Sequence, residues 1–280
     1  MLSYRHAFHA GNHADVLKHW IYSLVLDYFN QKDKPYWVMD THAGAGVYQL
    51  ESAMAHKTAE YREGIARLQQ ATDRPQTFAI YMQAVQALHH KISPQVYPGS
   101  PAIAMHFLRD SDKLRLFELH PADHALLTEY VAPFKRQVQV AMKDGFEGIK
   151  ACLPPPTKRG VVLIDPPYEL KEDYQRVVDC IKESLKRFAT GTYLVWYPLL
   201  QRPEPALMIE KLQALNTDYV HVTLHVSQPG ADGFGMFGSG MLILNPPWTL
   251  ANQIEPCLPW LASTLAQDAS ANAQMQVRIR

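Results

Sequence analysis

Four consecutive residues, Asp165-Pro166-Pro167-Tyr168, could activate an amino group, and they follow directly on the apolar run at 161–164. Because two prolines extend neither a strand nor a helix, this sequence is unusual for an ordinary turn after a buried strand. The amino nitrogen of an aromatic base is a poor nucleophile, since its lone pair is delocalised into the ring. The Asp165 carboxylate and the Pro166 carbonyl, stiffened by Pro167, can accept hydrogen bonds from that amino group and release the lone pair. Tyr168 offers a face for the base, and such stacking contributes roughly 1–3 kcal/mol per base.

A second candidate is the glycine-rich turn at 40–46, DTHAGAG, which follows a short apolar run at 36–39. Gly44 and Gly46 permit a positive φ and let the backbone approach a ligand closely. The third glycine of a dinucleotide fingerprint is missing, because position 49 is Gln, and this argues against NAD or FAD. Taken alone, the segment fits a tight strand-to-helix turn equally well.

Two acidic residues follow further predicted strands. Glu118 lies in FELHP, where its carboxylate can accept hydrogen bonds from ribose hydroxyls. Asp144 can accept from the amino group of an adenine-containing cofactor, while Gly145 keeps the backbone close to it. For each acid alone, a helix N-cap is an equally good interpretation.

The sequence contains a rival to the first tetrad, NPPW at 245–248, which also follows a strand pattern. Strand order separates the two. Glu118, Asp144 and Asp165 end the second, third and fourth predicted strands, which should be parallel neighbours. Asn245 ends the last strand of a predicted hairpin outside that series, so we interpret it as structural.

The N-terminal stretch at 4–13, YRHAFHAGNH, is dense in aromatic, basic and imidazole groups and precedes a helix that carries Lys18 and His19. Such a mixture suits nucleic-acid phosphates and unstacked bases, although a solvated arm is the alternative. Lys18 could instead meet the carboxylate of a cofactor. The histidine positions 6, 9 and 13 match no compact ligand spacing, so we expect no metal.

The elements that must position these residues alternate between strands and helices. Helices are predicted over 13–31, over most of 55–110, and near 121–132, 145, 171–188 and 204–215. The predicted strands are 36–39, 114–119, 138–142, 161–165, 192–198, 219–226 and 240–245. Alternation predicts an α/β fold with about seven strands, mainly parallel, closed by an antiparallel hairpin. Ligands of such sheets bind at the carboxyl ends of the strands. The polar tail 268–280 is expected to be frayed.

Composition sets limits on the function. The 280 residues carry 27 Lys and Arg against 27 Asp and Glu, so a nucleic-acid partner would need a local basic face. The isolated Cys152, Cys180 and Cys257 favour a reducing cytoplasm over a disulfide framework. No window of about 18 apolar residues predicts a membrane span.

Together these motifs resemble the class I Rossmann-like methyltransferases that modify the N6 amino group of adenine. Those enzymes often have Asp-x-Phe-x-Gly-x-Gly, and here His42 replaces the Phe. More closely, the chain resembles the RlmJ family of bacterial 23S ribosomal RNA adenine-N6 methyltransferases along nearly its whole length, up to about Leu265. The strings that carry this resemblance are YRHAFHAGNHADVLKH, DTHAGAG, YPGSP, FELHP, DPPYE, FATGTYLVWYP and SGMLILNPPW.

The resemblance implies one methyltransferase domain over 1–280, with an N-terminal arm and helix at 1–31 and a helical insertion at 50–110 between the first two strands. It implies S-adenosylmethionine as cofactor and 23S ribosomal RNA, protein-free or early in assembly, as substrate of a cytoplasmic monomer. The implied cofactor residues are Lys18, His19, His42, Gly44, Gly46, Ser100, Glu118, Asp144, Gly145 and Asp165. Asp165, Pro166 and Tyr168 would be catalytic, and Tyr4, Arg5 and His6 would face the RNA.

Three other functions remain open from the sequence. A DNA adenine-N6 methyltransferase would carry the same tetrad, and only the whole-chain resemblance favours RNA. A protein glutamine methyltransferase usually has Asn at the first position of the tetrad, whereas this chain has Asp165. A non-catalytic RNA-binding module would not be expected to keep the tetrad and all the acids.

Overall fold

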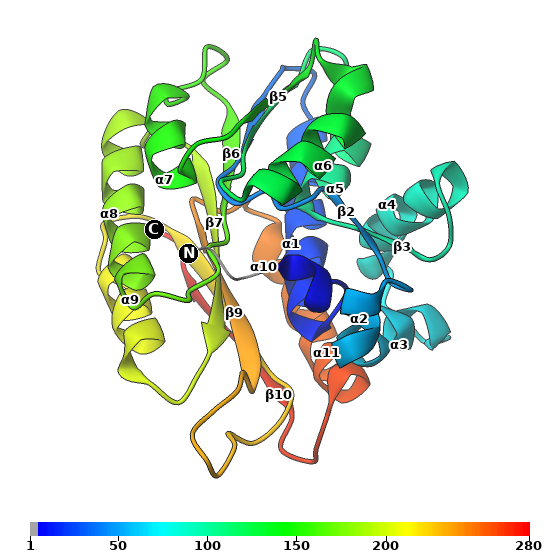
Figure 1. The fold of residues 1–280 in the computed structure, drawn as a ribbon. Coiled ribbons are helices and arrows are strands. Elements are labelled where there is room, and N and C mark those ends of the chain that lie inside the picture. Colours follow the sequence, from blue (N-terminus) through cyan, green and yellow to red (C-terminus); the bar gives the residue numbers. More distant parts are fainter. Residues whose placement is uncertain (1–4) are drawn as a thin grey trace.

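The central sheet has eight strands in the order β10-β8-β9-β7-β6-β1-β4-β5, in a computed structural model that describes residues 5–280 (Figure 1). Five neighbouring strands run parallel to one another, which confirms the predicted parallel core of the sheet. These strands are β1 (Trp37–Asp40), β4 (Lys113–Phe117), β5 (Val138–Ala141), β6 (Gly160–Ile164) and β7 (Thr192–Leu199).

The other three strands of this sheet are antiparallel to their neighbours. The predicted hairpin is formed by β8 (Tyr219–His225) and β9 (Gly238–Leu244), with β9 inserted next to β7. The prediction of a frayed tail is wrong, because Asn272–Arg278 forms β10, which pairs with β8 along its whole length. Short polar residues alternate there with Ala273, Met275 and Val277, and this pattern suits an edge strand.

Helices cover both faces of the sheet (Figure 1). Along each strand, alternate side chains enter two different cores: Val161 and Leu163 of β6 pack on one face, and Val162 and Ile164 on the other. All five residues of β6 are buried, as expected of a central parallel strand. One face carries α7 (Gly145–Gly148), α8 (Glu172–Arg187) and α9 (Pro203–Gln213), and the other carries α1 (His13–Asn30), α5 (Ser100–Phe107), α6 (Pro121–Val131), α10 (Leu250–Ile254) and α11 (Leu258–Leu265).

The first helix, α1, is buried on almost every side, because it lies against β9 and also packs on α4 (Phe78–Lys91) and α5. Its apolar residues, such as Leu17 and Trp20, belong to the larger core. The helix begins at an N-cap, where the Asn12 side chain accepts a hydrogen bond from the N–H of Asp15 at 2.9 Å. This start places the polar residues of the first two turns at the carboxyl ends of the parallel strands.

The chain between β1 and β4 contains the predicted helices, but it also contains a small antiparallel sheet that the sequence did not predict. This sheet pairs β2 with β3 and brings the start of α5 next to the glycine-rich turn, where Gly99 N–H donates to the Gly46 carbonyl at 2.9 Å. The elements here are β2 (Val47–Gln49), α2 (Ala53–Thr58), η2 (Glu60–Glu63), α3 (Ile65–Gln70), α4, β3 (Val96–Pro98) and α5.

The direction of the strands places the two tetrads at opposite ends of the central strands. Because β9 is antiparallel to β7, Leu244 pairs with Tyr193 at the start of β7, whereas Asp165 follows the carboxyl end of β6. Asn245 is held there by its own side chain, whose Nδ2 donates to the carbonyls of Ala189 and Gly191, both at 2.8 Å. These hydrogen bonds give Asn245 a structural role, because they stabilise the turn that precedes β7.

Among the described residues, 5–280, no helix combines the length and the apolar character needed to cross a membrane.

We expect removal of residues 268–280 to lower the melting temperature, because β8 would lose its partner and become an open edge. Loss of Arg278 would also free the carbonyls of Leu215 and Thr217, which its guanidinium now binds. The shift should exceed the roughly 2–4 °C that 1 kcal/mol produces in a domain about this size. Calorimetry of the truncated and full-length chains measures it, and the single variant Arg278→Gln should show only part of the loss. An unchanged melting temperature would contradict a stabilising role of β10.

Candidate active site

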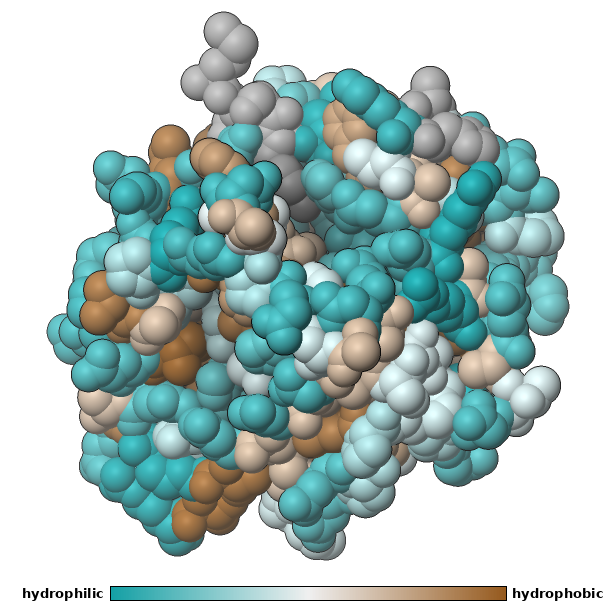
Figure 2. Space-filling model, turned by 90° about the horizontal axis from the view of Figure 1, so that it is seen from below, coloured by the Kyte–Doolittle hydropathy of each residue, from teal (hydrophilic) through white to brown (hydrophobic). Residues whose placement is uncertain are grey.

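A cavity of about 390 Å³ lies at the carboxyl ends of β1, β4, β5 and β6, beside the first turns of α1. This is where open α/β sheets bind their ligands. The edge of the molecule seen in Figure 2 is mainly hydrophilic, with apolar side chains in separate patches. The predicted site residues that line the cavity are His6, Lys18, His19, His42, Gly44, Ser100, Glu118, Asp144, Gly145, Asp165, Pro166 and Tyr168.

The glycine-rich turn is fastened to the end of β4 by Glu118. Gly44 has φ 61°, and its N–H donates to Glu118 Oε2 at 2.8 Å. The other carboxylate oxygen accepts the N–H of His120 at 2.6 Å. Burial raises the pKa of Glu118, and the two N–H donors oppose that rise. Since each carboxylate oxygen can accept more than one hydrogen bond, Glu118 keeps acceptor capacity for ligand hydroxyls.

Gly46 does not line the cavity, contrary to its predicted role as a ligand contact. Its φ is 82°, and a Cβ there would lie 2.9 Å from the side chain of Leu127. Glycine is needed at this position to let α6 pack under the turn.

Asp144 serves as an N-cap and also lies at the cavity. Its Oδ1 accepts the N–H of Phe146 at 3.0 Å, and its Oδ2 forms an ion pair with Arg176. Burial would raise the pKa of Asp144, but Arg176 lowers it below its usual range. Gly145 is required for packing, because a Cβ there would lie 1.9 Å from the Thr41 carbonyl oxygen. Asp144 can therefore cap the helix and still face a ligand in the cavity.

A buried acid that the sequence did not single out, Asp40, ties the first strand to α5. Ser100 Oγ donates to Asp40 Oδ2 at 2.6 Å, and the N–H of His42 donates to Oδ1 at 3.1 Å. Burial raises the pKa of Asp40 to about 7, although both donors lower it. The only sequence signal was its place at the end of an apolar run, just before the glycines.

His42 lies at the position where the motif that the sequence resembles often has Phe. Burial lowers its pKa to about 4, so the imidazole is neutral at physiological pH. Its ring meets Phe146 edge-on with centroids 4.9 Å apart, and Nδ1 lies 2.7 Å from Thr41 Oγ1. A neutral imidazole in this setting packs as an aromatic ring, so the substitution keeps the shape of this wall.

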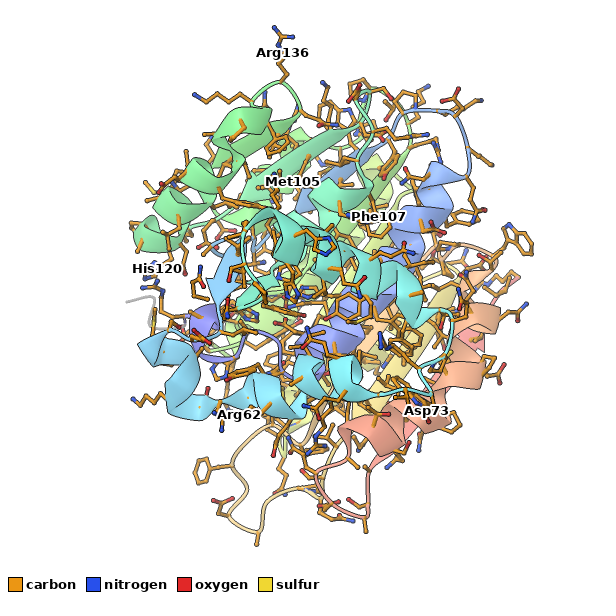
Figure 3. All side chains as sticks on the ribbon, turned by 90° about the vertical axis from the view of Figure 1, so that its right-hand side faces the viewer. Arg62, Asp73, Met105, Phe107, His120 and Arg136 are labelled. Atoms are coloured by element: carbon orange, nitrogen blue, oxygen red, sulfur yellow. The ribbon has the colours of Figure 1, made fainter. Side chains whose placement is uncertain are left out.

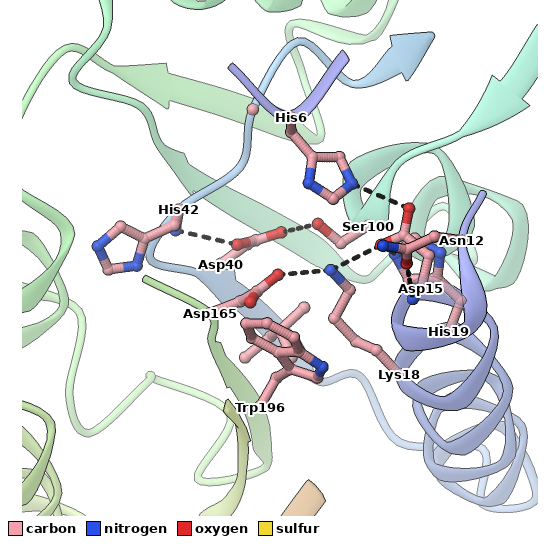
Figure 4. A network of polar contacts seen from close by, with 12 residues as sticks. His6, Asn12, Asp15, Lys18, His19, Asp40, His42, Ser100, Asp165 and Trp196 are labelled. Carbon is pink, nitrogen blue, oxygen red and sulfur yellow. Dashed lines mark hydrogen bonds and ion pairs between the residues drawn. The ribbon is translucent and has the colours of Figure 1, made fainter. Parts of the chain in front are cut away.

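A buried ion network joins α1 to the end of β6 (Figure 4). Lys18 Nζ lies 2.6 Å from Asp165 Oδ2 and 2.9 Å from Asp15 Oδ1. Burial would lower the pKa of Lys18, but the two carboxylates raise it, so the side chain stays a cation. Asp15 is 1% exposed and also accepts the N–H of Gly11 and His6 Nε2, both at 2.9 Å. Sequence analysis missed Asp15, although its place three residues before Lys18 on a helix was a usable signal.

The tetrad itself differs from the prediction in one respect. Tyr168 is 3% exposed, its hydroxyl donates to the Trp196 carbonyl at 2.7 Å, and its ring packs against Tyr174. Most of the Tyr168 ring is therefore buried in the core, although the residue also lines the cavity, and its predicted stacking on a base remains a prediction. Trp196, which also lines the cavity and lies 5.6 Å from the Lys18 ammonium, is the aromatic ring beside Asp165.

The N-terminal residues differ in their placement. Tyr4 lies outside the described residues. The Arg5 guanidinium forms an ion pair with Asp123 at 2.9 Å, so its charge is already compensated. His19, predicted as a cofactor residue, hydrogen-bonds Tyr97 Oη through Nδ1 at 2.8 Å, and burial lowers its pKa to about 3. Within residues 5–280, no group of three His, Cys, Asp or Glu side chains is arranged to hold a metal ion.

Comparison with known proteins agrees with this geometry. A family model described as "Ribosomal RNA large subunit methyltransferase D, RlmJ" matches residues 33–278. The chain belongs to this family. Ribosomal RNA large subunit methyltransferase J of Escherichia coli K12 is 48% identical over 98% of this chain and 97% of its own length, and that of Haemophilus influenzae is 44% identical over 97% of each. A crystal structure of a protein from Legionella pneumophila has a TM-score of 0.88 at 34% identity and covers 96% of this chain and 98% of its own.

Membership of the family makes the chain a ribosomal RNA methyltransferase that uses S-adenosylmethionine, with the Rossmann-like fold that was predicted. The residues present fit that cofactor. The Gly44 turn carries a positive φ at the cavity wall, Glu118 keeps acceptor capacity for ribose hydroxyls, and the cavity volume is in the range of small-molecule sites.

We expect Glu118→Ala to weaken binding of S-adenosylmethionine about tenfold to a hundredfold, the range for hydrogen bonds to a charged group. The rate of a single turnover at saturating cofactor should change less, because ribose contacts differ little between ground state and transition state. Titration calorimetry gives the affinity, and Glu129→Ala, on the exposed side of α6, is the matched control. Equal affinities of the wild type and Glu118→Ala would remove Glu118 from the site.

Asp40 should make stability depend on pH. Its pKa of about 7 in the fold lies above the value of 3.8 for an unfolded chain, so its stabilising contribution is complete only below about pH 4 and is lost as the pH rises through 7. Asp40→Asn should therefore gain free energy of unfolding relative to the wild type as the pH increases across that window. Urea titrations at several pH values measure the difference, with the exposed Asp110→Asn as control. A difference that stays constant with pH would contradict the buried, titrating Asp40.

Proposed function

We propose that the protein methylates the N6 amino group of one adenine in 23S ribosomal RNA, with Asp165, Pro166 and Tyr168 as the catalytic tetrad residues. The observation that carries the proposal is the position of Asp165, which follows β6 and lines the same cavity as Glu118 and the Gly44 turn. An amino group at Asp165 would thus lie beside the pocket whose walls suit the methyl donor.

The two carboxylate oxygens of Asp165 would have different tasks. Oδ2 is bound by Lys18, whereas Oδ1 has no hydrogen-bond partner among the residues that the structure describes. We assign Oδ1 to the N6–H of adenine and the Pro166 carbonyl to the second N–H. Both hydrogen bonds strengthen as the nitrogen becomes pyramidal, so they favour the transition state over the bound substrate.

S-adenosylmethionine supplies an electrophilic methyl group when it is bound. In the proposed reaction the methyl carbon would pass from the cofactor sulfur to the adenine nitrogen, and the nitrogen would then release one proton. Asp165 Oδ1, already hydrogen-bonded to this N–H, is positioned to take up the proton. Lys18 holds the carboxylate in place through Oδ2, and Asp15 in turn holds Lys18.

The substrate base must leave its helix to reach Asp165, because the reacting atom of a paired base is inaccessible; the adenine is therefore flipped or already unpaired. Tyr4, Arg5 and His6 are assigned to the RNA side of the site, and His6 lines the cavity. Tyr168 is 3% exposed, so stacking of its ring on the base would require more of its face to open to the cavity, whereas Trp196 already lines the cavity beside Asp165. The remaining cofactor contacts are assigned to His19, His42, Ser100, Asp144 and Gly145.

The substrate is proposed to be ribosomal RNA that is free of protein or early in assembly, acted on by a monomer in the cytoplasm. Labelled methyl transfer to unmodified 23S ribosomal RNA, with assembled large subunits and genomic DNA as parallel substrates, tests this. Label at N6 of a single adenine in free RNA supports the proposal. Label in DNA alone, or at another atom of the RNA, contradicts it.

Asp165→Ala should slow methyl transfer about 10²–10³-fold, the usual effect of removing one preorganised transition-state contact. Asn245→Ala should leave the rate unchanged and lower the melting temperature, because Asn245 stabilises a turn at the opposite end of the central strands. Single-turnover assays at saturating cofactor and RNA compare the two, and melting temperature controls for folding. A folded but inactive Asn245 variant beside an active Asp165 variant would identify the wrong tetrad.

A further inference from the structure

The molecule has a second groove that begins where the catalytic cavity ends. It has a volume of about 1130 Å³ and shares Lys143 and Asp144 with the cavity. From there it follows β5, because its walls also include Gln139 within that strand and Lys135 just before it. We call it the β5 groove. It connects the site to the opposite end of the outermost parallel strand.

The β5 groove is lined by three cations, an aromatic ring, apolar side chains and two acids, Asp144 and Glu147, which are paired with Arg176 and Lys150. Lys143 stands at the end near the cavity, Lys135 at the far end, and Arg115 between them. The Arg115 guanidinium lies 4.2 Å from the centre of the Trp37 ring, which also forms part of the wall. Cationic groups interleaved with an aromatic surface are the usual lining of a path for single-stranded nucleic acid.

At its far end the β5 groove opens on a cluster that we call the basic edge, formed by the loops that precede β1, β4, β5 and β6. Arg109 joins two of these loops through bonds to the carbonyls of Lys32 and Lys34, both at 2.9 Å. Lys113 Nζ, at the start of β4, donates to the Arg136 carbonyl at 2.9 Å and so adds the loop before β5. The exposed cations of the basic edge are Lys32, Lys34, Lys135, Arg136 and Lys158.

Figure 3 shows Arg136 projecting from the end of the molecule opposite to Arg62. None of the five exposed cations forms an ion pair with a residue in the described range 5–280. Helix ends account for part of this charge, since α1, α5 and α6 terminate nearby and cations are favoured there. Arg109 and Arg159 have such a structural role, because their guanidinium groups donate to backbone carbonyls. The five exposed cations have no such hydrogen bonds among the described residues.

The charges around the catalytic cavity, at the carboxyl ends of the parallel strands, are mostly paired. Two of the cations there are compensated, Lys18 by Asp15 and Asp165 and Arg176 by Asp144, whereas the exposed Lys143, at the junction with the β5 groove, has no ion pair with a residue in the described range. The whole chain carries no net charge, yet a polyanionic substrate needs uncompensated cations. The described residues offer them at the basic edge and along the groove that leads from it to the site.

We propose that the β5 groove and the basic edge bind the RNA strand that flanks the target adenine, through phosphates at Lys135, Arg136 and Lys158 and through Arg115 and Lys143 along the way. This inference rests on the proposed function for the identity of the RNA. It adds a binding path on the side of the sheet away from the N-terminal arm. Long RNA should use the whole path, whereas a few nucleotides bound at the cavity should occupy at most its near end.

The test compares two doubly neutralised variants. Lys135→Gln with Arg136→Gln removes two charges from the basic edge. Lys211→Gln with Arg280→Gln removes one charge from α9 and one from the chain end after β10, the edge strand at the side of the sheet away from β5. Binding of in vitro transcribed 23S ribosomal RNA is measured over a range of salt, and binding of a four-nucleotide oligoadenylate at one salt concentration.

The basic-edge variant should bind the transcript about tenfold more weakly at low salt, and its slope of log K against log salt should be shallower by about 0.7–0.9 for each phosphate that the variant no longer neutralises. Its affinity for the short oligonucleotide and its single-turnover rate on saturating transcript should match the wild type. The control variant should match the wild type throughout. Equal slopes for the two variants would overturn the β5 groove path, whether or not methyl transfer occurs. Normal slopes without transfer to any adenine would instead contradict the proposed function.

Discussion

The arrangement of the site depends on one buried cation. Lys18 has three neighbours at its charge, the carboxylates of Asp15 and Asp165 and the face of Trp196, and almost no water. Breaking a buried pair by removing one partner is strongly destabilising, since the remaining charge stays uncompensated. The same cation therefore holds the first helix against the sheet and fixes the direction of the Asp165 carboxylate. The stability of the fold and the orientation of the Asp165 carboxylate thus both depend on the Lys18 ammonium group.

Much of the fold could be predicted from the sequence because local patterns there agree with the tertiary structure. Apolar runs such as 161–164 are buried on both faces, and the strand-end acids all follow strands of the parallel block. Their order along the chain is not their order in the sheet, because β6 pairs with β1 and not with β5. β10 was missed because its alternation is weak: its apolar positions are Ala273, Met275 and Val277 among polar residues. β2 and β3 were missed because they have only three residues each.

The sequence predicted site residues well where a motif fixes the backbone position. It predicted them less well where the role depends on which side chains come into contact in the fold. Gly44 and Glu118 were expected to meet at the cavity, and they do. Tyr168 was expected to offer a ring face to the base, but in this structure its ring is buried and its hydroxyl donates to the Trp196 carbonyl in the next strand. Asp15 and Asp40 could not be ranked from sequence, because their importance comes from burial and from partners distant in the chain. Only the three-dimensional structure supplies that information.

The position of α1 has a consequence for folding order. This helix is made early, yet Lys18 binds a residue 147 positions later, and β9, on which the helix rests, is more distant still. Contacts of such high sequence separation close late, because the entropy of a long loop must be overcome before they form. The pairing of β1 with β6, in which Trp37 pairs with Gly160, closes a loop of similar length. The direction of the Asp165 carboxylate is therefore fixed only when α1 and the parallel strands have come together, and secondary structure alone does not supply it.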